Sequence, residues 1–304
     1  MSLGTGIWKS IRPKNISIIA LTFFGMQFLI EAFPSLQSEQ EHISKRLYFF
    51  LSLSVILLAA GGNVINDIQD VEVDAHNRAG KNPIPRDLGV QNAWSLYFIM
   101  TLSGLLIGMI SLIFLKAFHF WSIHIFIAGS LWFYSMHMQR QPLIGNFIVA
   151  LLCGLIPILI LLYEQSFSPI SALAMHGLIF YAIQAFLLTF MRELVKDLED
   201  MDGDSRHGYR TFPVVMGISW TKGIVTVIGL LVIGIEVKVL TELSVMLPRI
   251  PLLTFFSLLF FVPLVFVFIS LFKAHDKESF RSCARFLKCA MLAGLGSSLF
   301  FHFL

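Results

Sequence analysis

Long apolar runs, separated by short polar segments, make up most of the chain. A helix needs about 20 mostly apolar residues to cross a bilayer. Nine runs come close to or exceed this length, and each predicts a transmembrane helix: residues 15–33, 47–66, 91–114, 117–137, 143–163, 169–191, 213–235, 250–273 and 284–304. The pattern therefore predicts an all-α, polytopic membrane protein.

The composition supports this prediction. Of the 304 residues, 56% are hydrophobic and only 13% are charged, and the mean hydropathy is +0.78. Soluble domains average about 45–50% apolar and about 25% charged residues, so this chain has too little polar surface for a globule in water. A cytosolic enzyme, a disulfide-rich secreted module and a disordered chain are excluded. The cations are scattered between apolar runs, and we expect no nucleic-acid partner.

The positive charges predict an orientation in the membrane. Cytosolic segments of membrane proteins carry an excess of Lys and Arg. If the N-terminus is cytosolic, 17 of the 22 Lys and Arg residues fall in cytosolic segments. We therefore expect a cytosolic N-terminus, and nine spans then place the C-terminus outside.

Two predicted cytosolic segments hold most of the negative charge. Residues 63–90 and 192–213 contain 11 of the 19 Asp and Glu residues. The segments align without a gap at an offset of 130 residues, which pairs Asp67 with Asp197, Asp70 with Asp200, Asp74 with Asp204, and Pro83 with Pro213. The alignment indicates an internal repeat. We expect one membrane-embedded domain, 1–304, of two related halves, roughly 1–140 and 141–304.

Helical geometry places a strip of oxygen ligands on one face of each segment. At about 100° per residue, Asn63, Asn66, Asp67, Asp70 and Asp74 fall within an arc of about 100°, and Glu193, Asp197, Asp200 and Asp204 within about 60°. We expect Gly203 to end the second helix. Oxygen ligands suit a hard divalent ion, and Mg²⁺ is usually held by a few carboxylates together with substrate phosphates. The two strips therefore predict a site for a diphosphate carried by Mg²⁺; exposed charges on solvated loops are the simpler alternative.

The two strips resemble paired motifs of the UbiA superfamily of intramembrane prenyltransferases. The first motif is N-x-x-x-D-x-x-x-D, here Asn66 to Asp74, after the second predicted span. The second motif is D-x-x-x-D, here Asp200 to Asp204, after the sixth predicted span. The resemblance covers nearly the whole chain. It implies a bundle of nine transmembrane helices around a central cavity.

Residues 192–213 are most similar to the digeranylgeranylglyceryl phosphate synthase branch, which prenylates a glycerol hydroxyl to make an ether lipid. The resemblance implies Mg²⁺-dependent transfer of an isoprenyl group from a prenyl diphosphate to a lipophilic acceptor, here geranylgeranylglyceryl phosphate. It also implies an integral protein of a bacterial or archaeal cell membrane, in contact with lipid, whose active site faces the cytosol. The first alternative is an aromatic acceptor, such as a 4-hydroxybenzoate- or homogentisate-like acid. A cation or metabolite transporter is an alternative of another class, and an inactive lipid-binding scaffold is a third.

The resemblance and the charge pattern assign roles to individual residues. The expected Mg²⁺ ligands are Asn66, Asp70, Asp74, Asp200 and Asp204. The expected catalytic acids are Asp67, Asp70, Asp197 and Asp200, with either Asp67 or Asp197 as the base for the acceptor proton. The expected substrate-binding residues are Arg12, Lys14, Asn15, Arg78, Lys81, Arg140, Lys196 and Arg210.

Two positions depart from the family pattern. Asn82 stands where the family often has Arg, and Gln139 stands where it usually has Lys. Both changes remove a cation near the diphosphate or the acceptor. We expect Lys81 to supply part of the missing charge.

Overall fold

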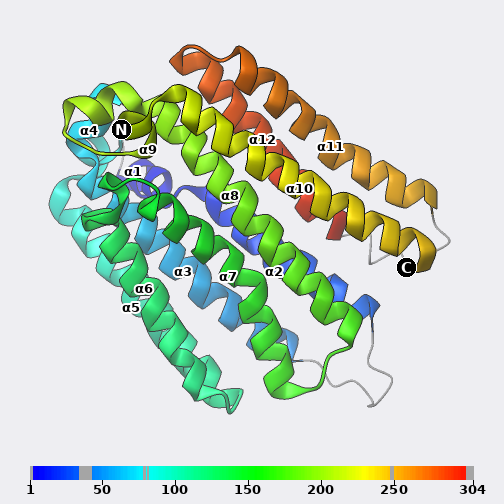
Figure 1. Ribbon diagram of the computed structural model, residues 1–304. Helices are drawn as coiled ribbons and strands as arrows, with labels where there is room; N and C mark the ends of the chain where they lie inside the picture. The colour runs from blue at the N-terminus through cyan, green and yellow to red at the C-terminus, as the bar shows by residue number, and fades with distance from the viewer. Residues whose placement is uncertain (1–2, 34–42, 78–79, 81, 247–249, 299–304) are drawn as a thin grey trace. The chain divides into compact units, whose positions relative to one another are not determined.

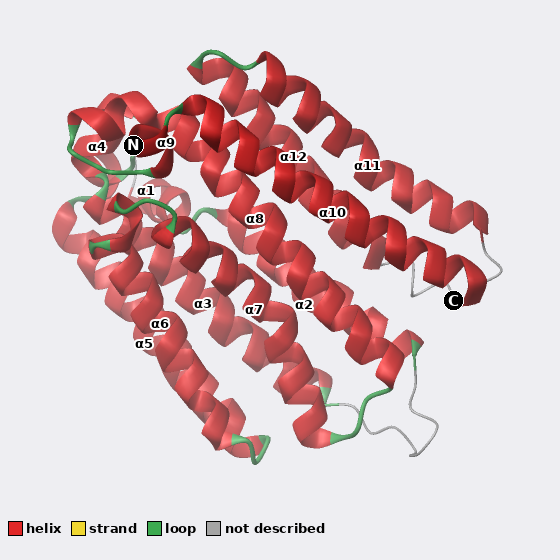
Figure 2. Cartoon of the chain, viewed as in Figure 1, coloured by secondary structure: helices red, strands yellow, loops and turns green. Residues whose placement is uncertain are grey.

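The structure, a computed structural model, describes residues 3–33, 43–77, 80, 82–246 and 250–298. Within these ranges the chain forms helices joined by loops, and no strand occurs (Figure 2). Every predicted span overlaps a described helix, and residues 299–304 of the last span lie outside the described residues. The all-α architecture that the apolar runs predict is therefore confirmed.

Six of the described helices are long and apolar enough to cross a membrane. They are α2 (Pro13–Ala32), α3 (Lys45–Gln69), α5 (Val90–Phe114), α7 (Ile144–Phe167), α8 (Ala172–Arg206) and α10 (Ile218–Met246). The other three predicted spans correspond to α6 (Trp121–Met136), α11 (Ile250–Lys273) and α12 (Lys277–Ser298). A shorter apolar helix, Leu258–Lys273, lies within α11. These helices make the chain a multi-pass membrane protein.

The chain divides into two compact units, and the first contains residues 1–23, 35–139 and 159–171. In this unit α3 packs against α5 and α6 (Figure 1). Gly104 of α5 allows the close approach, because a Cβ there would lie 2.9 Å from the carbonyl oxygen of Ser54 on α3. Small residues at such crossings let membrane helices pack backbone to backbone. The short helix α1 (Leu3–Ser10) packs against η1 (Ile84–Leu88) in the same unit.

The second unit contains residues 24–34, 140–158 and 172–304. Here α8 packs against α10 and α12, and α11 packs against α12 (Figure 1). Its apolar core includes Met191 and Leu194 of α8, Val225 of α10, Leu264 of α11 and Leu287 of α12, all fully buried. This core fixes the C-terminal end of α8, which carries the second acidic segment.

The two acidic segments end differently. In the first, α3 stops at Gln69, Asp70 caps it, and α4 (Val71–Asn77) begins anew. In the second, α8 continues to Arg206, so the prediction that Gly203 ends this helix is wrong. Gly203 is buried within the helix, and the left-handed conformation that glycine favours occurs at Gly208, with φ of 72°. The second acidic strip is therefore one continuous helical face.

Candidate active site

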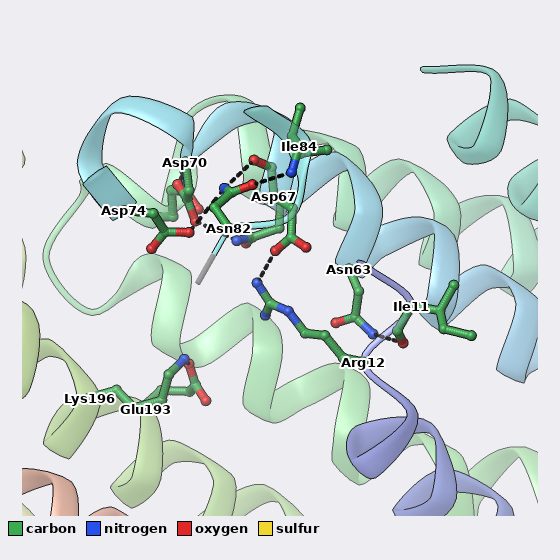
Figure 3. Close-up of polar contacts among 12 residues, drawn as sticks. Ile11, Arg12, Asn63, Asp67, Asp70, Asp74, Asn82, Ile84, Glu193 and Lys196 are labelled. Carbon is green, nitrogen blue, oxygen red and sulfur yellow. Dashed lines mark hydrogen bonds and ion pairs between the residues drawn. The ribbon is translucent and has the colours of Figure 1, made fainter. Parts of the chain in front are cut away.

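The first motif gathers its side chains at the end of α3 and in α4 (Figure 3). Asn66 donates a hydrogen bond to Oδ2 of Asp70, one helical turn further on. Nε2 of Gln139 donates to Oδ1 of Asp70 at 2.8 Å. Nδ2 of Asn82 donates to Oδ2 of Asp74 at 3.1 Å. Both carboxylates are thus oriented by neutral amides from other parts of the first unit.

The surroundings of Asp70 raise the pKa of its carboxyl group. Desolvation raises the pKa of Asp70 to about 6, and the nearby negative charge of Asp74 adds to the rise. The charge of Arg12 and the hydrogen bond from Gln139 oppose it. A carboxylate crowded by another acid in this way favours binding of a cation, because a cation stabilises the charged form of both.

Arg12 lies between α1 and α2 in the left-handed region, with φ of 52°. Its guanidinium forms an ion pair with Asp67 (Figure 3). The same stretch of backbone is held by Asn63, whose Nδ2 donates to the carbonyl oxygen of Ile11 at 3.1 Å. Pro13 then opens α2, a position that proline favours. The structure thus brings Arg12, an expected substrate-binding cation, onto the first motif itself.

The second motif lies on α8 in the second unit. Nδ2 of Asn146, near the start of α7, donates to Oδ2 of Asp197 at 2.8 Å. Glu193 forms ion pairs with Arg192 at 2.7 Å and with Lys196 at 2.8 Å. The ammonium of Lys196, which we expected to bind substrate, therefore has a carboxylate partner on its own helix.

The loop after α8 supports the end of this motif. Oγ1 of Thr211 donates to Oδ2 of the buried Asp204 at 3.2 Å. The guanidinium of Arg140 lies 5.0 Å from the ring centre of Tyr209, at a distance typical of cation–π contacts. The backbone N–H of Arg210 donates to the carbonyl oxygen of Arg140 at 2.9 Å. Two expected substrate-binding arginines are therefore adjacent in the chain's second unit.

The remaining expected site residues differ in their exposure, and two of them are not described. Lys14 is exposed and Asn15 is half-buried in the first turn of α2. Asp200 is half-buried on α8, one turn before Asp204. Arg78 and Lys81 lie outside the described residues.

Sequence reasoning missed the amides that orient the acids. In the sequence, Asn82 and Gln139 stand out only as positions where the family has a cation. Gln139 is 69 residues away from its partner Asp70 along the chain. Amides carry no charge and follow no periodic pattern, so only the fold reveals these pairings.

The donor set at the first motif suits Mg²⁺. Among the residues that the structure describes, no three His, Cys, Asp or Glu side chains lie close enough to hold a metal ion by themselves. Mg²⁺ does not need such a cage, because one or two carboxylates with substrate phosphates and water usually hold it. Asp70 and Asp74 supply carboxylate oxygens, and Asn66 supplies an amide oxygen beside them. This chemistry fits a hard cation.

Solved structures share the fold. One, from work on digeranylgeranylglyceryl phosphate synthase in membranes, aligns with a TM-score of 0.63 and 22% identity over 97% of this chain and 98% of that one. A UbiA homologue from Archaeoglobus fulgidus, bound to DMAPP and Mg²⁺, aligns with a TM-score of 0.58 and 16% identity over 94% of this chain and 98% of that one. At these identities the likeness concerns the fold.

Curated relatives are similar in sequence. Digeranylgeranylglyceryl phosphate synthase of Thermococcus sibiricus is 35% identical over 242 residues, which are 78% of this chain and 75% of the relative. The enzyme of the same name from Methanoculleus marisnigri is 36% identical over 172 residues, and this match spans 56% of the chain and only 57% of the relative. The model of the UbiA prenyltransferase family matches residues 19–295. The match takes in both acidic motifs and the helices that carry them, and the chain belongs to the UbiA prenyltransferase family.

Proposed function

We propose that this chain transfers a geranylgeranyl group from geranylgeranyl diphosphate to the hydroxyl of geranylgeranylglyceryl phosphate, with Mg²⁺ as cofactor. The observation that carries the proposal is the pair of oxygen-rich helix ends, on α3 and on α8, in a membrane protein of this family. The relatives named digeranylgeranylglyceryl phosphate synthase support the choice of acceptor. The Archaeoglobus homologue bound to Mg²⁺ supports the choice of cofactor.

The acids of the two motifs would hold the metal and the diphosphate. The proposed ligands are Asn66, Asp70, Asp74, Asp200 and Asp204. These residues would hold Mg²⁺, which would supply positive charge to offset the charge on the leaving diphosphate. Arg140 and Arg210 would add charge-assisted hydrogen bonds to phosphate oxygens of the diphosphate or of the acceptor. Lys14 and Asn15 would bind substrate at the first motif.

The reaction exchanges one carbon–oxygen bond for another. The allylic carbon–oxygen bond of the prenyl diphosphate breaks, and diphosphate leaves with the electron pair. The acceptor hydroxyl oxygen then bonds to the allylic carbon, and its proton passes to a carboxylate, either Asp67 or Asp197. Asn146 orients Asp197, and Arg12 orients Asp67. The apolar helices around the site would exclude the water that quenches an allylic cation.

The membrane arrangement is part of the proposal. We infer nine transmembrane helices around a central cavity, with the N-terminus and both acidic motifs on the cytosolic side. The excess of Lys and Arg in the segments between alternate spans supports this orientation. A soluble diphosphate headgroup would then reach the site from the cytosol while the prenyl tail stays in lipid.

A substrate panel tests the proposal. Purified protein in detergent is incubated with labelled geranylgeranyl diphosphate, Mg²⁺, and either geranylgeranylglyceryl phosphate or an aromatic acid such as 4-hydroxybenzoate. We expect a labelled ether lipid with the glyceryl phosphate acceptor, and none when EDTA replaces Mg²⁺. Turnover with the aromatic acid alone would reject the acceptor. Ion or metabolite flux in proteoliposomes, with no diphosphate release, would reject prenyl transfer and favour a transporter.

A further inference from the structure

Two amide side chains from outside the first motif, those of Asn82 and Gln139, donate hydrogen bonds to its carboxylates. Nδ2 of Asn82 lies 3.1 Å from Oδ2 of Asp74 and 2.8 Å from the carbonyl oxygen of Asp67. Oδ1 of Asn82 accepts a hydrogen bond from the backbone N–H of Ile84 at 3.0 Å. The buried Asn82 is thus held at both ends of its amide, so its donor direction toward Asp74 is fixed.

Gln139 orients the carboxylate of Asp70 by a hydrogen bond, as Asn82 orients that of Asp74. Its Nε2 lies 2.8 Å from Oδ1 of Asp70, while Asn66 donates to the other oxygen of the same carboxylate. Gln139 belongs to the short helix η3 (Met138–Arg140), which follows α6. Donors from α3 and η3 therefore fix both oxygens of Asp70.

Neutral donors and cations have opposite consequences for metal binding. Each carboxylate oxygen offers two lone-pair sites, so an amide that takes one leaves another for a cation. An amide also leaves the negative charge of the carboxylate in place, whereas a Lys or Arg at the same point offsets it and repels a divalent ion. Asp67 illustrates the second case, because Arg12 forms an ion pair with it.

We propose that Asn82 and Gln139 are positioning residues for a divalent cation, because they hold Asp74 and Asp70 in place with neutral donors and leave both charges available to the metal. Asn82 and Gln139, the two departures from the family pattern, thereby gain a role in metal binding. The inference rests on the proposed function for its link to catalysis, but metal binding can be measured without substrate.

Binding of Mn²⁺ to the purified protein, followed by electron paramagnetic resonance without any diphosphate, tests this role. We expect Asn82→Ala and Gln139→Ala each to weaken Mn²⁺ binding by about 10- to 100-fold, as is typical when partners of metal ligands are removed. Asn82→Lys and Gln139→Lys should weaken it further than the alanine variants, because the ammonium offsets the carboxylate charge. A residue that only supports the fold would not produce this dependence on charge.

Matched amides nearby serve as controls. Nδ2 of Asn92 donates to the carbonyl oxygen of Leu88 at 2.9 Å, and Gln91 is exposed. Asn92→Ala and Gln91→Ala should bind Mn²⁺ like the wild type. If the buried Asn82 cannot be changed without unfolding, the partly exposed Gln139 variants decide the question, with thermal melting as the check on folding.

The outcomes separate this inference from the proposed function. Folded Asn82→Ala and Gln139→Ala variants with wild-type Mn²⁺ affinity would overturn the inference, even if the wild type transfers geranylgeranyl groups. Weakened Mn²⁺ binding in the variants of a wild type that transfers no prenyl group would support the inference and refute the proposed function.

Discussion

At the scale of residues, the acids of the first motif differ in the charge of their partners. Asp67 forms an ion pair with Arg12, whereas Asp70 and Asp74 accept hydrogen bonds from amides. The sequence identifies all three as candidates because they share one helical face. The sequence does not show that their partners differ in charge, because these partners come from three other segments of the chain. Residue type and spacing thus locate the site, and the fold assigns the partners.

Arg12 offers a test of backbone strain at this site. A residue other than glycine loses about 1–2 kcal/mol in the left-handed region, and Arg12 has φ of 52°. Arg12→Ala loses the ion pair with Asp67 and keeps the strain, whereas Arg12→Gly loses the pair and relieves the strain. We expect Arg12→Gly to be more stable than Arg12→Ala by about 1 kcal/mol in thermal denaturation in detergent. Lys14→Ala, at an exposed position of α2, should melt like the wild type. Equal stability of the two Arg12 variants would contradict this account.

At the scale of elements, the apolar runs predict where helices lie but not how they end. Within the described residues each predicted span overlaps a helix, because a continuous apolar run of this length has few other stable forms in a bilayer. The break between α3 and α4 and the unbroken end of α8 were not predicted. Glycine alone does not end a helix when packing holds it, as at Gly203. Hydrogen-bond partners distant in sequence, such as Asn146 for Asp197, escape prediction for the same reason: they depend on packing.

The crossing of α3 and α5 depends on Gly104. A Cβ at this position would lie 2.9 Å from the carbonyl oxygen of Ser54 and 3.0 Å from the side chain of Leu58, and the backbone carbonyl cannot yield cheaply. We expect Gly104→Val to lower stability by about 1–3 kcal/mol, a typical cost of overpacking. Gly129→Val on α6 is the control, because a Cβ there meets nothing within 4 Å. Thermal melts of both variants in detergent should show a lower Tm for Gly104→Val only, and equal shifts would contradict the close packing of the two helices.

At the scale of the whole molecule, the chain is a multi-pass membrane protein of the UbiA prenyltransferase family. Its few charges are not spread evenly: more than half of the acids lie in two short segments. The structure places each segment at the end of a long helix, one in each compact unit. Composition alone predicts that the chain is a membrane protein. The positions of its few carboxylates predict that it is an enzyme.

The proposed orientation makes opposite predictions for two exposed positions. Ser205, at the end of α8, and Lys116, between α5 and α6, are both exposed. In a background with Cys153, Cys283 and Cys289 replaced by Ala, we expect Ser205→Cys to react with an impermeant maleimide only from the cytosolic side. Lys116→Cys should react only from the outside. Sealed vesicles of both orientations provide the measurement, and the reverse pattern would refute the cytosolic placement of the acidic motifs.

The central claim is that the acids of both motifs carry out Mg²⁺-dependent prenyl transfer. The most direct measurement is the rate of geranylgeranyl transfer by Asp70→Asn and Asp200→Asn, beside the exposed neighbours Glu72→Gln and Asp202→Asn as matched controls. Each variant removes one negative charge with almost no change in size. We predict that both motif variants lose at least about 100-fold in rate while remaining folded, and that both controls keep wild-type rates. Wild-type transfer by either motif variant would contradict the account.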